Sequence, residues 1–180
     1  MAAIIRLERE QLVDICAQAS EESGLQVQVA NDNCPGQIVI SGNVHALDKA
    51  MELASAAGAR RPQRLPISIA AHSPLMESVA AEYRREVQRH PFVTPYTPVI
   101  ANTTAAPMLT VEDIYEELTA QLTAPVRWRE SMLHLLSEGI TDFVELGPKD
   151  VLTGLLRRID RSANGHPMCT PAAIAALASA

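Results

Sequence analysis

The sequence predicts an α/β protein in which a ferredoxin-like βαββαβ unit over residues 1–67 precedes a partial α/β layer over residues 68–160. The first region has the order of short strands and amphipathic helices that this topology requires. The second region also alternates strands with helices, which is typical of a parallel sheet, but its strands are too few to form one alone. Residues 161–180, rich in alanine, are expected to form a loosely ordered tail.

The elements of the first region follow from the spacing of its apolar residues. Residues 9–23 carry apolar side chains at helical spacing, and Gly24 follows where a helix C-cap is expected. Residues 25–29 alternate apolar and polar side chains, as a half-buried strand does. A turn is predicted at 31–36. The other predicted elements are strands at 3–7, 37–41 and 64–67 and a helix at 44–57.

Prolines divide the second region into its elements. Ser73 and Pro74 are residue types that favour the start of a helix, which is predicted to continue to about residue 89. A proline-rich connector then leads to a short strand at 99–100. The elements predicted after this strand are helices at 111–122, 126–138 and 150–159 and a strand at 141–146.

Composition excludes several classes of protein. The net charge of −6 argues against a general binder of nucleic acid or of anionic membranes, because both need a basic surface. No run approaches the ~20 apolar residues that span a bilayer, and no signal peptide is visible. The three cysteines, Cys16, Cys34 and Cys169, lie far apart without metal-ligand spacing. They are interpreted as reduced thiols, which predicts a cytoplasmic protein without a metal site.

Six short segments resemble those of one enzyme family. The most specific is Ala71-His72-Ser73-Pro74-Leu75-Met76, and the others are residues 30–42, 57–61, 65–68, 121–128 and 145–148. Each match is weak alone, but together, in this order and spacing across nearly the whole chain, they resemble the malonyl-CoA:acyl-carrier-protein transacylases. The opening Met1-Ala2-Ala3-Ile4-Ile5 resembles the point at which those enzymes enter their small ferredoxin-like subdomain.

The resemblance implies that residues 68–160 are the C-terminal part of an α/β-hydrolase-like acyltransferase core. In the family, this core carries a serine on a strained G-H-S-x-G turn. No Gly-x-Ser-x-Gly occurs among the eight glycines of this sequence. In family members the serine and an arginine that binds malonyl both precede the position matching Met1. The chain is therefore expected to be a fragment, or one half of a split protein, that is inactive without an N-terminal half carrying the serine.

The resemblance also implies a ping-pong reaction of fatty acid or polyketide biosynthesis. A serine takes the malonyl group from coenzyme A as an ester and passes it to the phosphopantetheine thiol of acyl carrier protein, while a histidine moves the protons. Malonyl-CoA and acyl carrier protein are the implied partners. No bound cofactor is implied, because the coenzyme A thioester is a substrate.

His72 is the predicted general base. An imidazole can accept and donate protons near neutral pH, because its unperturbed pKa is about 6.5. A lone histidine is more often structural or solvated, so the catalytic assignment depends on the match around it. Gln121 matches a family glutamine that helps to orient the catalytic ring, and the alternative is a glutamine on a helix surface. The remaining histidines are predicted to be surface residues: His45, His90, His134 and His166.

Three positions are predicted to lie near the substrate. Asn31 and Asn33 match asparagines of the loop beside the active-site cleft, although Asn before Pro-Gly is also an ordinary turn former. Ala71 stands where many malonyl-specific members have phenylalanine and others have serine. The smaller side chain leaves more room, so strict selectivity for malonyl is not expected.

Arg60, Arg61 and Arg64 form a basic cluster in an otherwise acidic chain. The family docks its acidic carrier protein near this edge of the subdomain, and complementary charge would speed and orient the encounter. A solvated strand end is the alternative interpretation. The cluster also supports a rival hypothesis for the chain, a non-catalytic module that binds acyl carrier protein without transferring anything.

Overall fold

The computed structural model describes residues 1–177, and its internal contacts divide the chain into two compact units between Ser131 and Met132. The boundary expected after residue 67 lies inside the first unit. None of the helices in the described part of the chain has both the length and the apolar character needed to span a bilayer.

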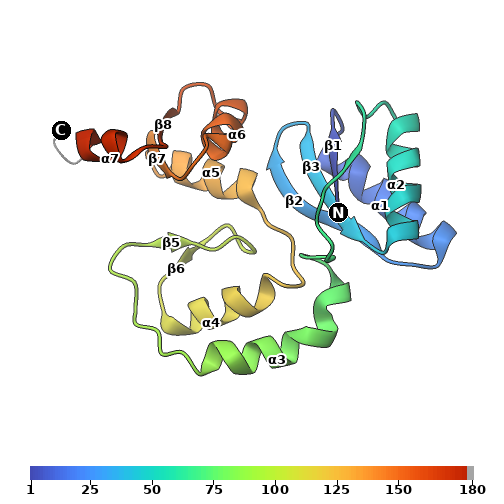
Figure 1. The fold of residues 1–180 in the computed structure, drawn as a ribbon, viewed down its shortest axis with the longest axis horizontal. Coiled ribbons are helices and arrows are strands. Elements are labelled where there is room, and N and C mark those ends of the chain that lie inside the picture. Colours follow the sequence, from blue (N-terminus) through green and yellow to red (C-terminus); the bar gives the residue numbers. More distant parts are fainter. Residues whose placement is uncertain (178–180) are drawn as a thin grey trace. The chain divides into compact units, whose positions relative to one another are not determined.

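The first unit begins with a four-stranded antiparallel sheet (Figure 1). Its elements are β1 (Ala2–Ile5), α1 (Arg9–Ser23), β2 (Val27–Cys34), β3 (Gln37–Gly42), α2 (Val44–Ala56) and β4 (Gln63–Arg64). The strand order is β2-β3-β1-β4, and each neighbouring pair is antiparallel. This order and these directions confirm the predicted ferredoxin-like βαββαβ topology.

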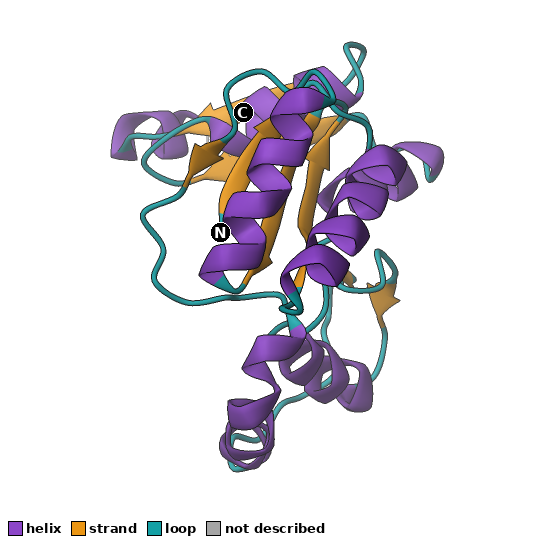
Figure 2. Ribbon diagram, turned by 90° about the vertical axis from the view of Figure 1, so that its right-hand side faces the viewer, coloured by secondary structure: helices purple, strands orange, loops and turns teal. Residues whose placement is uncertain are grey.

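The two helices α1 and α2 cover one face of this sheet (Figure 2). Their apolar stripes and the inward-facing strand residues form a single aliphatic core, in which Ile4, Leu12 and Ile40 are almost completely buried. Helix α1 ends at Gly24, whose left-handed conformation (φ 66°) suits the expected C-cap. The core therefore forms from the same periodic positions that predict the elements.

Strand β2 is longer than the sequence analysis predicted. The segment 31–36 was expected to be a turn, but β2 continues to Cys34, and the turn is confined to Pro35 and Gly36. Irregular register at two points, between Val29 and Asn31 and between Asp32 and Cys34, lets the strand keep its pairing with β3. Such β-bulges accommodate extra residues that would otherwise end the strand.

The rest of the first unit consists of short helices and one small hairpin. Its elements are a 3₁₀ turn, η1 (Pro74–Met76), followed by α3 (Glu77–Gln88), β5 (Val99–Ile100), β6 (Pro107–Met108) and α4 (Val111–Ala120). A reciprocal capping box between Thr110 and Asp113 starts α4. The buried carboxylate of Glu117 then accepts hydrogen bonds from the backbone N–H of Asn102 (2.8 Å) and Thr103 (3.2 Å), which fixes the β5–β6 loop to α4.

The second unit is a βαβ arrangement with flanking helices. Its elements are β7 (Asp142–Leu146), α6 (Val151–Ile159), β8 (Asn164–Met168) and α7 (Pro171–Leu177), and helix α5 (Trp128–Ser137) crosses from the first unit into it. Strands β7 and β8 pair in parallel along their whole length. Helix α6 packs closely on β8, because Thr153 of α6 occupies the space that a side chain at Gly165 would need.

The expectation of a loosely ordered tail was wrong for most of residues 161–180. Residues 164–168 form β8 and residues 171–177 form α7, whereas residues 178–180 lie outside the described part of the structure. The sequence Asn-Gly-His-Pro-Met has little intrinsic strand preference. Its strand forms because β7 offers a complete row of backbone partners, and Pro167 is tolerated in a strand that pairs on one side.

Candidate active site

His72 lies in the connection between β4 and η1 and has an unusual backbone conformation. Its φ of 59° is in the left-handed region, which residues with a Cβ seldom adopt. The next residue, Ser73, is almost completely buried, and its hydroxyl donates a hydrogen bond to the carbonyl of Ala70 (2.7 Å). The chain thus makes a tight bend at His72, and the residue is half-buried.

The imidazole of His72 is held by a main-chain carbonyl. Its Nδ1 atom lies 2.6 Å from the carbonyl oxygen of Gln121. A carbonyl oxygen can only accept a hydrogen bond, so in the neutral ring the proton is on Nδ1. The lone pair is then on Nε2, and this atom can accept a proton from a substrate or from another side chain.

Gln121 therefore contacts His72 through its backbone. The residue is the C-cap of α4, and its own N–H donates to the carbonyl of Glu117 (3.0 Å). The sequence analysis singled out Gln121 by its residue type, but the ring contact requires only a main-chain oxygen at this place. The geometry does not depend on the side-chain amide.

The segment that carries Gln121 is fixed to the free edge of β2. The N–H of Val126 donates to the carbonyl of Ala30 (2.8 Å), and the N–H of Asp32 donates to the carbonyl of Val126 (3.0 Å). Together these bonds form an isolated parallel bridge at Asn31. The bridge gives β2 a second neighbour opposite β3, and it places the end of α4 beside His72.

The two predicted asparagines lie on β2 next to this bridge. Asn31 and Asn33 are both half-buried, and Asp32 between them is buried. The strand conformation replaces the ordinary Asx turn that was the alternative interpretation of this stretch. Their role toward a substrate stays a prediction.

Asp32 is a feature that the sequence analysis did not single out. It is 5% exposed, and within the described residues its Oδ1 atom has no hydrogen-bond partner. Burial raises the pKa of this carboxyl, and the opposing attraction of Arg129 and Arg9 does not compensate. The only signal in the sequence was an acidic residue between two asparagines, which also fits a turn.

Ala71 does not lie in open space. Its half-buried side chain packs against a small apolar cluster formed by Met1, Ala30 and Val39. A larger residue at this position would have to displace the cluster or turn away from it. The expected link between Ala71 and acyl selectivity stays a prediction.

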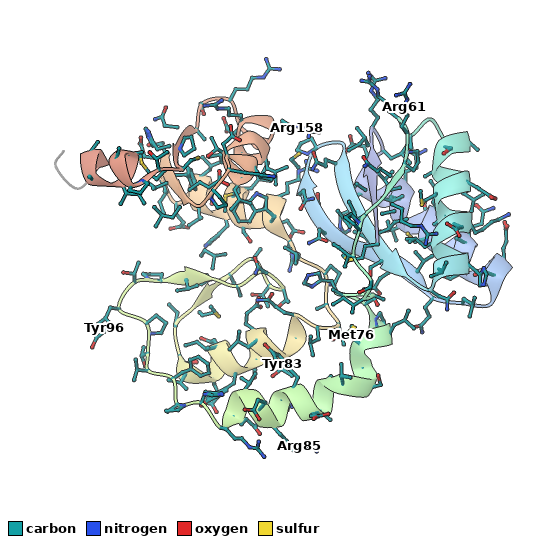
Figure 3. All side chains as sticks on the ribbon, viewed as in Figure 1. Arg61, Met76, Tyr83, Arg85, Tyr96 and Arg158 are labelled. Carbon is teal, nitrogen blue, oxygen red and sulfur yellow. The ribbon has the colours of Figure 1, made fainter. Side chains whose placement is uncertain are left out.

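The three arginines of the basic cluster have different surroundings. The side chain of Arg64 forms an ion pair with Asp48. Arg60 and Arg61 are exposed, and Figure 3 shows Arg61 pointing outward from the loop between α2 and β4. The backbone of Arg60 donates to the carbonyl of Ile5 (2.8 Å), which attaches this loop to β1. The part of the cluster available to a partner is therefore Arg60 and Arg61.

The thiols of this chain are distributed between the core and the surface. Cys16 and Cys34 are buried, and Cys169 is exposed. Burial raises the pKa of the Cys16 thiol to about 12, so this thiol stays protonated and unreactive at neutral pH. Among the described residues there is no cluster of His, Cys, Asp and Glu side chains that could hold a metal ion.

Comparison with known proteins identifies the relatives of this chain. Residues 9–175 match a family described as the acyl transferase domain. The chain is 42% identical over 161 residues to the malonyl CoA-acyl carrier protein transacylase of Bacillus subtilis, covering 89% of this chain and 50% of the relative. It is 35% identical over 176 residues to that of Escherichia coli, covering 98% and 56%. The chain thus spans about half the length of these curated relatives.

Solved structures give the same relationship. The fold superposes with a TM-score of 0.92 on a malonyl-CoA:acyl carrier protein transacylase from Xanthomonas oryzae, at 36% identity and with 98% of this chain and 55% of the other covered. A malonyl-transacylase in complex with a type II PKS acyl-carrier protein superposes with a TM-score of 0.94 at 32% identity, covering 99% and 58%.

The main-chain contact at His72 leads to a first prediction. Gln121→Ala should leave the Nδ1-protonated tautomer of His72 in place, because the carbonyl at position 121 remains. Val126→Pro should disrupt it, because proline has no N–H to donate to Ala30. The measurement is the ¹⁵N spectrum of the imidazole nitrogens, with His72→Ala to assign the signals. Loss of this tautomer in Gln121→Ala would show that the side chain orients the ring.

A second prediction concerns Asp32 and pH. Burial raises the pKa of Asp32 in the folded state, so folding favours the protonated carboxyl. The resulting contribution to stability is fully present below the unfolded pKa of about 3.9, and it is lost as the pH rises through the folded pKa. Asp32→Asn should therefore raise the unfolding midpoint at neutral pH, and this gain should vanish in acid. Thermal unfolding at several pH values measures it.

The matched control for this measurement is Asp14→Asn, which changes an exposed aspartate of α1. This control should have little effect on the midpoint at any pH, because exposed charges contribute little to stability. A midpoint that falls in Asp32→Asn at neutral pH would mean that attraction to Arg9 and Arg129 outweighs burial.

Proposed function

The chain belongs to the acyl transferase domain family, and we propose that it supplies the general base for malonyl transfer from coenzyme A to acyl carrier protein. His72 is the base, and the nucleophilic serine comes from a polypeptide segment outside these 180 residues. The observation that carries the proposal is the contact of His72 Nδ1 with the carbonyl of Gln121, which leaves Nε2 able to accept a proton.

The proposed reaction has two symmetrical halves. In the first, His72 Nε2 takes the proton of the serine hydroxyl while the serine oxygen attacks the malonyl thioester carbonyl. The carbon–sulfur bond then breaks, the imidazolium returns the proton to the coenzyme A sulfur, and the malonyl group remains as a serine ester. In the second half, the phosphopantetheine thiol gives its proton to Nε2 and attacks the ester, and the serine oxygen leaves with that proton.

Two properties of the chain support a nucleophile from elsewhere. No Gly-x-Ser-x-Gly elbow occurs in the sequence, and the chain spans only about half the length of the relatives it matches. The buried Cys16 thiol, with its pKa of about 12, is no substitute. Malonyl-CoA and acyl carrier protein are proposed as substrates because the named relatives are malonyl CoA-acyl carrier protein transacylases.

The proposal predicts that the chain alone transfers no acyl group and gains activity with a complementing segment. A base without a hydroxyl to deprotonate has no reaction to assist, so the isolated chain should stay at background with radiolabelled malonyl-CoA. Mixed or fused with an N-terminal transacylase segment carrying the serine, it should produce a labelled ester on that segment. In this reconstituted enzyme His72→Ala should reduce turnover by on the order of 10⁴-fold or more.

The controls separate the possible failures. His134→Ala, which changes a histidine outside the proposed site, should leave the reconstituted turnover nearly unchanged. A covalent label on the isolated 180-residue chain would contradict the proposal, because it would reveal a nucleophile within this chain. Full activity of His72→Ala in the reconstituted enzyme would contradict the assignment of the base.

We further propose that Arg60 and Arg61 dock the carrier protein, with Arg64 contributing less because it pairs with Asp48. Carrier proteins are acidic, and opposite charges on two surfaces accelerate their encounter. The double variant Arg60→Glu/Arg61→Glu should slow malonyl transfer to acyl carrier protein by on the order of tenfold at low salt. The defect should shrink at high salt, because salt screens exposed charges.

The acceptor distinguishes docking from catalysis in this experiment. Transfer to free pantetheine should be nearly unchanged in Arg60→Glu/Arg61→Glu. The matched charge reversal Arg84→Glu/Arg85→Glu on α3 should leave both acceptors nearly unaffected. Equal losses with both acceptors would remove the docking argument. Carrier-protein binding by a chain that stays inactive with every serine-bearing segment would favour the rival function, a non-catalytic binding module.

A further inference from the structure

Gln28 of β2 makes a contact with His72 that its position in the sequence does not suggest. Its side-chain amide nitrogen donates a hydrogen bond to the main-chain carbonyl of His72 at 2.8 Å, across 44 residues of sequence. Gln28 is paired with Ser41 of β3 through its backbone, so the side chain extends from a fixed strand. The contact therefore ties the bend at His72 to the sheet.

The bend needs such support because His72 is in the left-handed region. A residue with a Cβ keeps this conformation only where the surrounding structure holds it, since extended or right-handed backbone is otherwise preferred. Rotation of the peptide after His72 would move its carbonyl away from Gln28. The amide of Gln28 thus opposes the change that would carry the imidazole away from Gln121.

Both contacts on His72 depend on strand β2. Gln28 reaches the backbone of His72 directly, and the bridge between β2 and Val126 positions the carbonyl of Gln121 that binds the ring. A cavity of about 400 Å³ is lined by Gln28, Thr123 and Pro125 together with residues of α1. Because Gln28 borders this open space, truncating its side chain would remove the amide without leaving a closed void in a packed core.

We infer that Gln28 is a positioning residue for His72, which holds the left-handed bend so that Nδ1 meets the Gln121 carbonyl and Nε2 remains free. The consequence for acyl transfer rests on the proposed function, but the positioning itself can be measured in the isolated chain. The ring, its tautomer and its hydrogen exchange report on it without any substrate.

The test uses ¹⁵N-labelled chain at about pH 8, where an unperturbed imidazole is neutral. Gln28→Ala should raise the exchange rate of the His72 Nδ1 proton by about 2- to 10-fold, the effect of losing one net hydrogen bond. The ¹⁵N signals of Nδ1 and Nε2 should move toward each other as the other tautomer becomes populated. Gln28→Glu has the same shape without the amide donor, and it should show the same changes.

Gln26→Ala is the matched control, because Gln26 is an exposed glutamine two residues earlier. Its His72 signals should remain those of the wild type, and the amide spectra of all three variants should remain those of a folded chain. Wild-type exchange and shifts in either Gln28 variant would overturn the inference. Equal changes in Gln26→Ala would also overturn it, because they would show a general effect on this part of the chain.

Kinetics in the reconstituted enzyme then measure the consequence for transfer. Gln28→Ala should lower kcat by about 2- to 10-fold and leave KM for malonyl-CoA nearly unchanged, because the ring is the only group displaced. If the reconstituted wild-type enzyme were inactive, the proposed function would fail while the spectra would still decide the positioning of His72. A loss confined to KM would contradict a positioning role.

Discussion

The site depends on the edge of β2 opposite β3. An edge strand presents unpaired N–H and C=O groups that must find partners, and in this chain two of them pair with a single residue, Val126. This small bridge joins a local α+β unit to a segment almost a hundred residues later. The bridge fixes the segment after α4 to the sheet, close to the carbonyl of Gln121 that contacts His72.

The structure also shows how the ring and the backbone of His72 are held within this chain. Nδ1 is protonated because a carbonyl faces it, and the bend is held because Gln28 binds the carbonyl of His72. Both partners belong to, or are fixed by, β2, and the core beneath β2 is formed by α1 and α2. The tautomer of His72 therefore depends on the partners bound at the edge of β2. The position of β2 depends on the sheet, and the sheet depends on the apolar faces of the two helices that cover it.

These dependences also show what the sequence could predict. The ferredoxin-like topology was predictable because each strand and helix carries its own periodic pattern. The role of His72 came from the resemblance of its neighbours to a family motif, and it stays a prediction. The bridge at Val126, the contact of Gln28 and strand β8 were not predictable, since each depends on a partner far away in sequence. Gln121 was selected for its side chain, although its contact with the ring is made by the backbone, which every residue type provides. The Oδ1 atom of Asp32, which has no hydrogen-bond partner among the described residues, was not predictable for a similar reason, because burial is a property of the folded chain.

A carbonyl in place of a carboxylate has a consequence for the proposed chemistry. In a Ser-His-Asp triad, the buried aspartate stabilises the imidazolium that forms when the serine is deprotonated. The carbonyl of Gln121 is neutral and stabilises that charge less, so the imidazolium returns its proton more readily. A thiolate leaving group needs little protonation by the imidazolium, because thiols have pKa values near 8.5 and leave far more easily than amines. The two half-reactions also exchange one thiol for another, so the base must release the proton as easily as it accepts it. A base oriented by a backbone dipole is suited to this nearly symmetrical transfer, and its partner cannot be lost through a change of side chain at position 121.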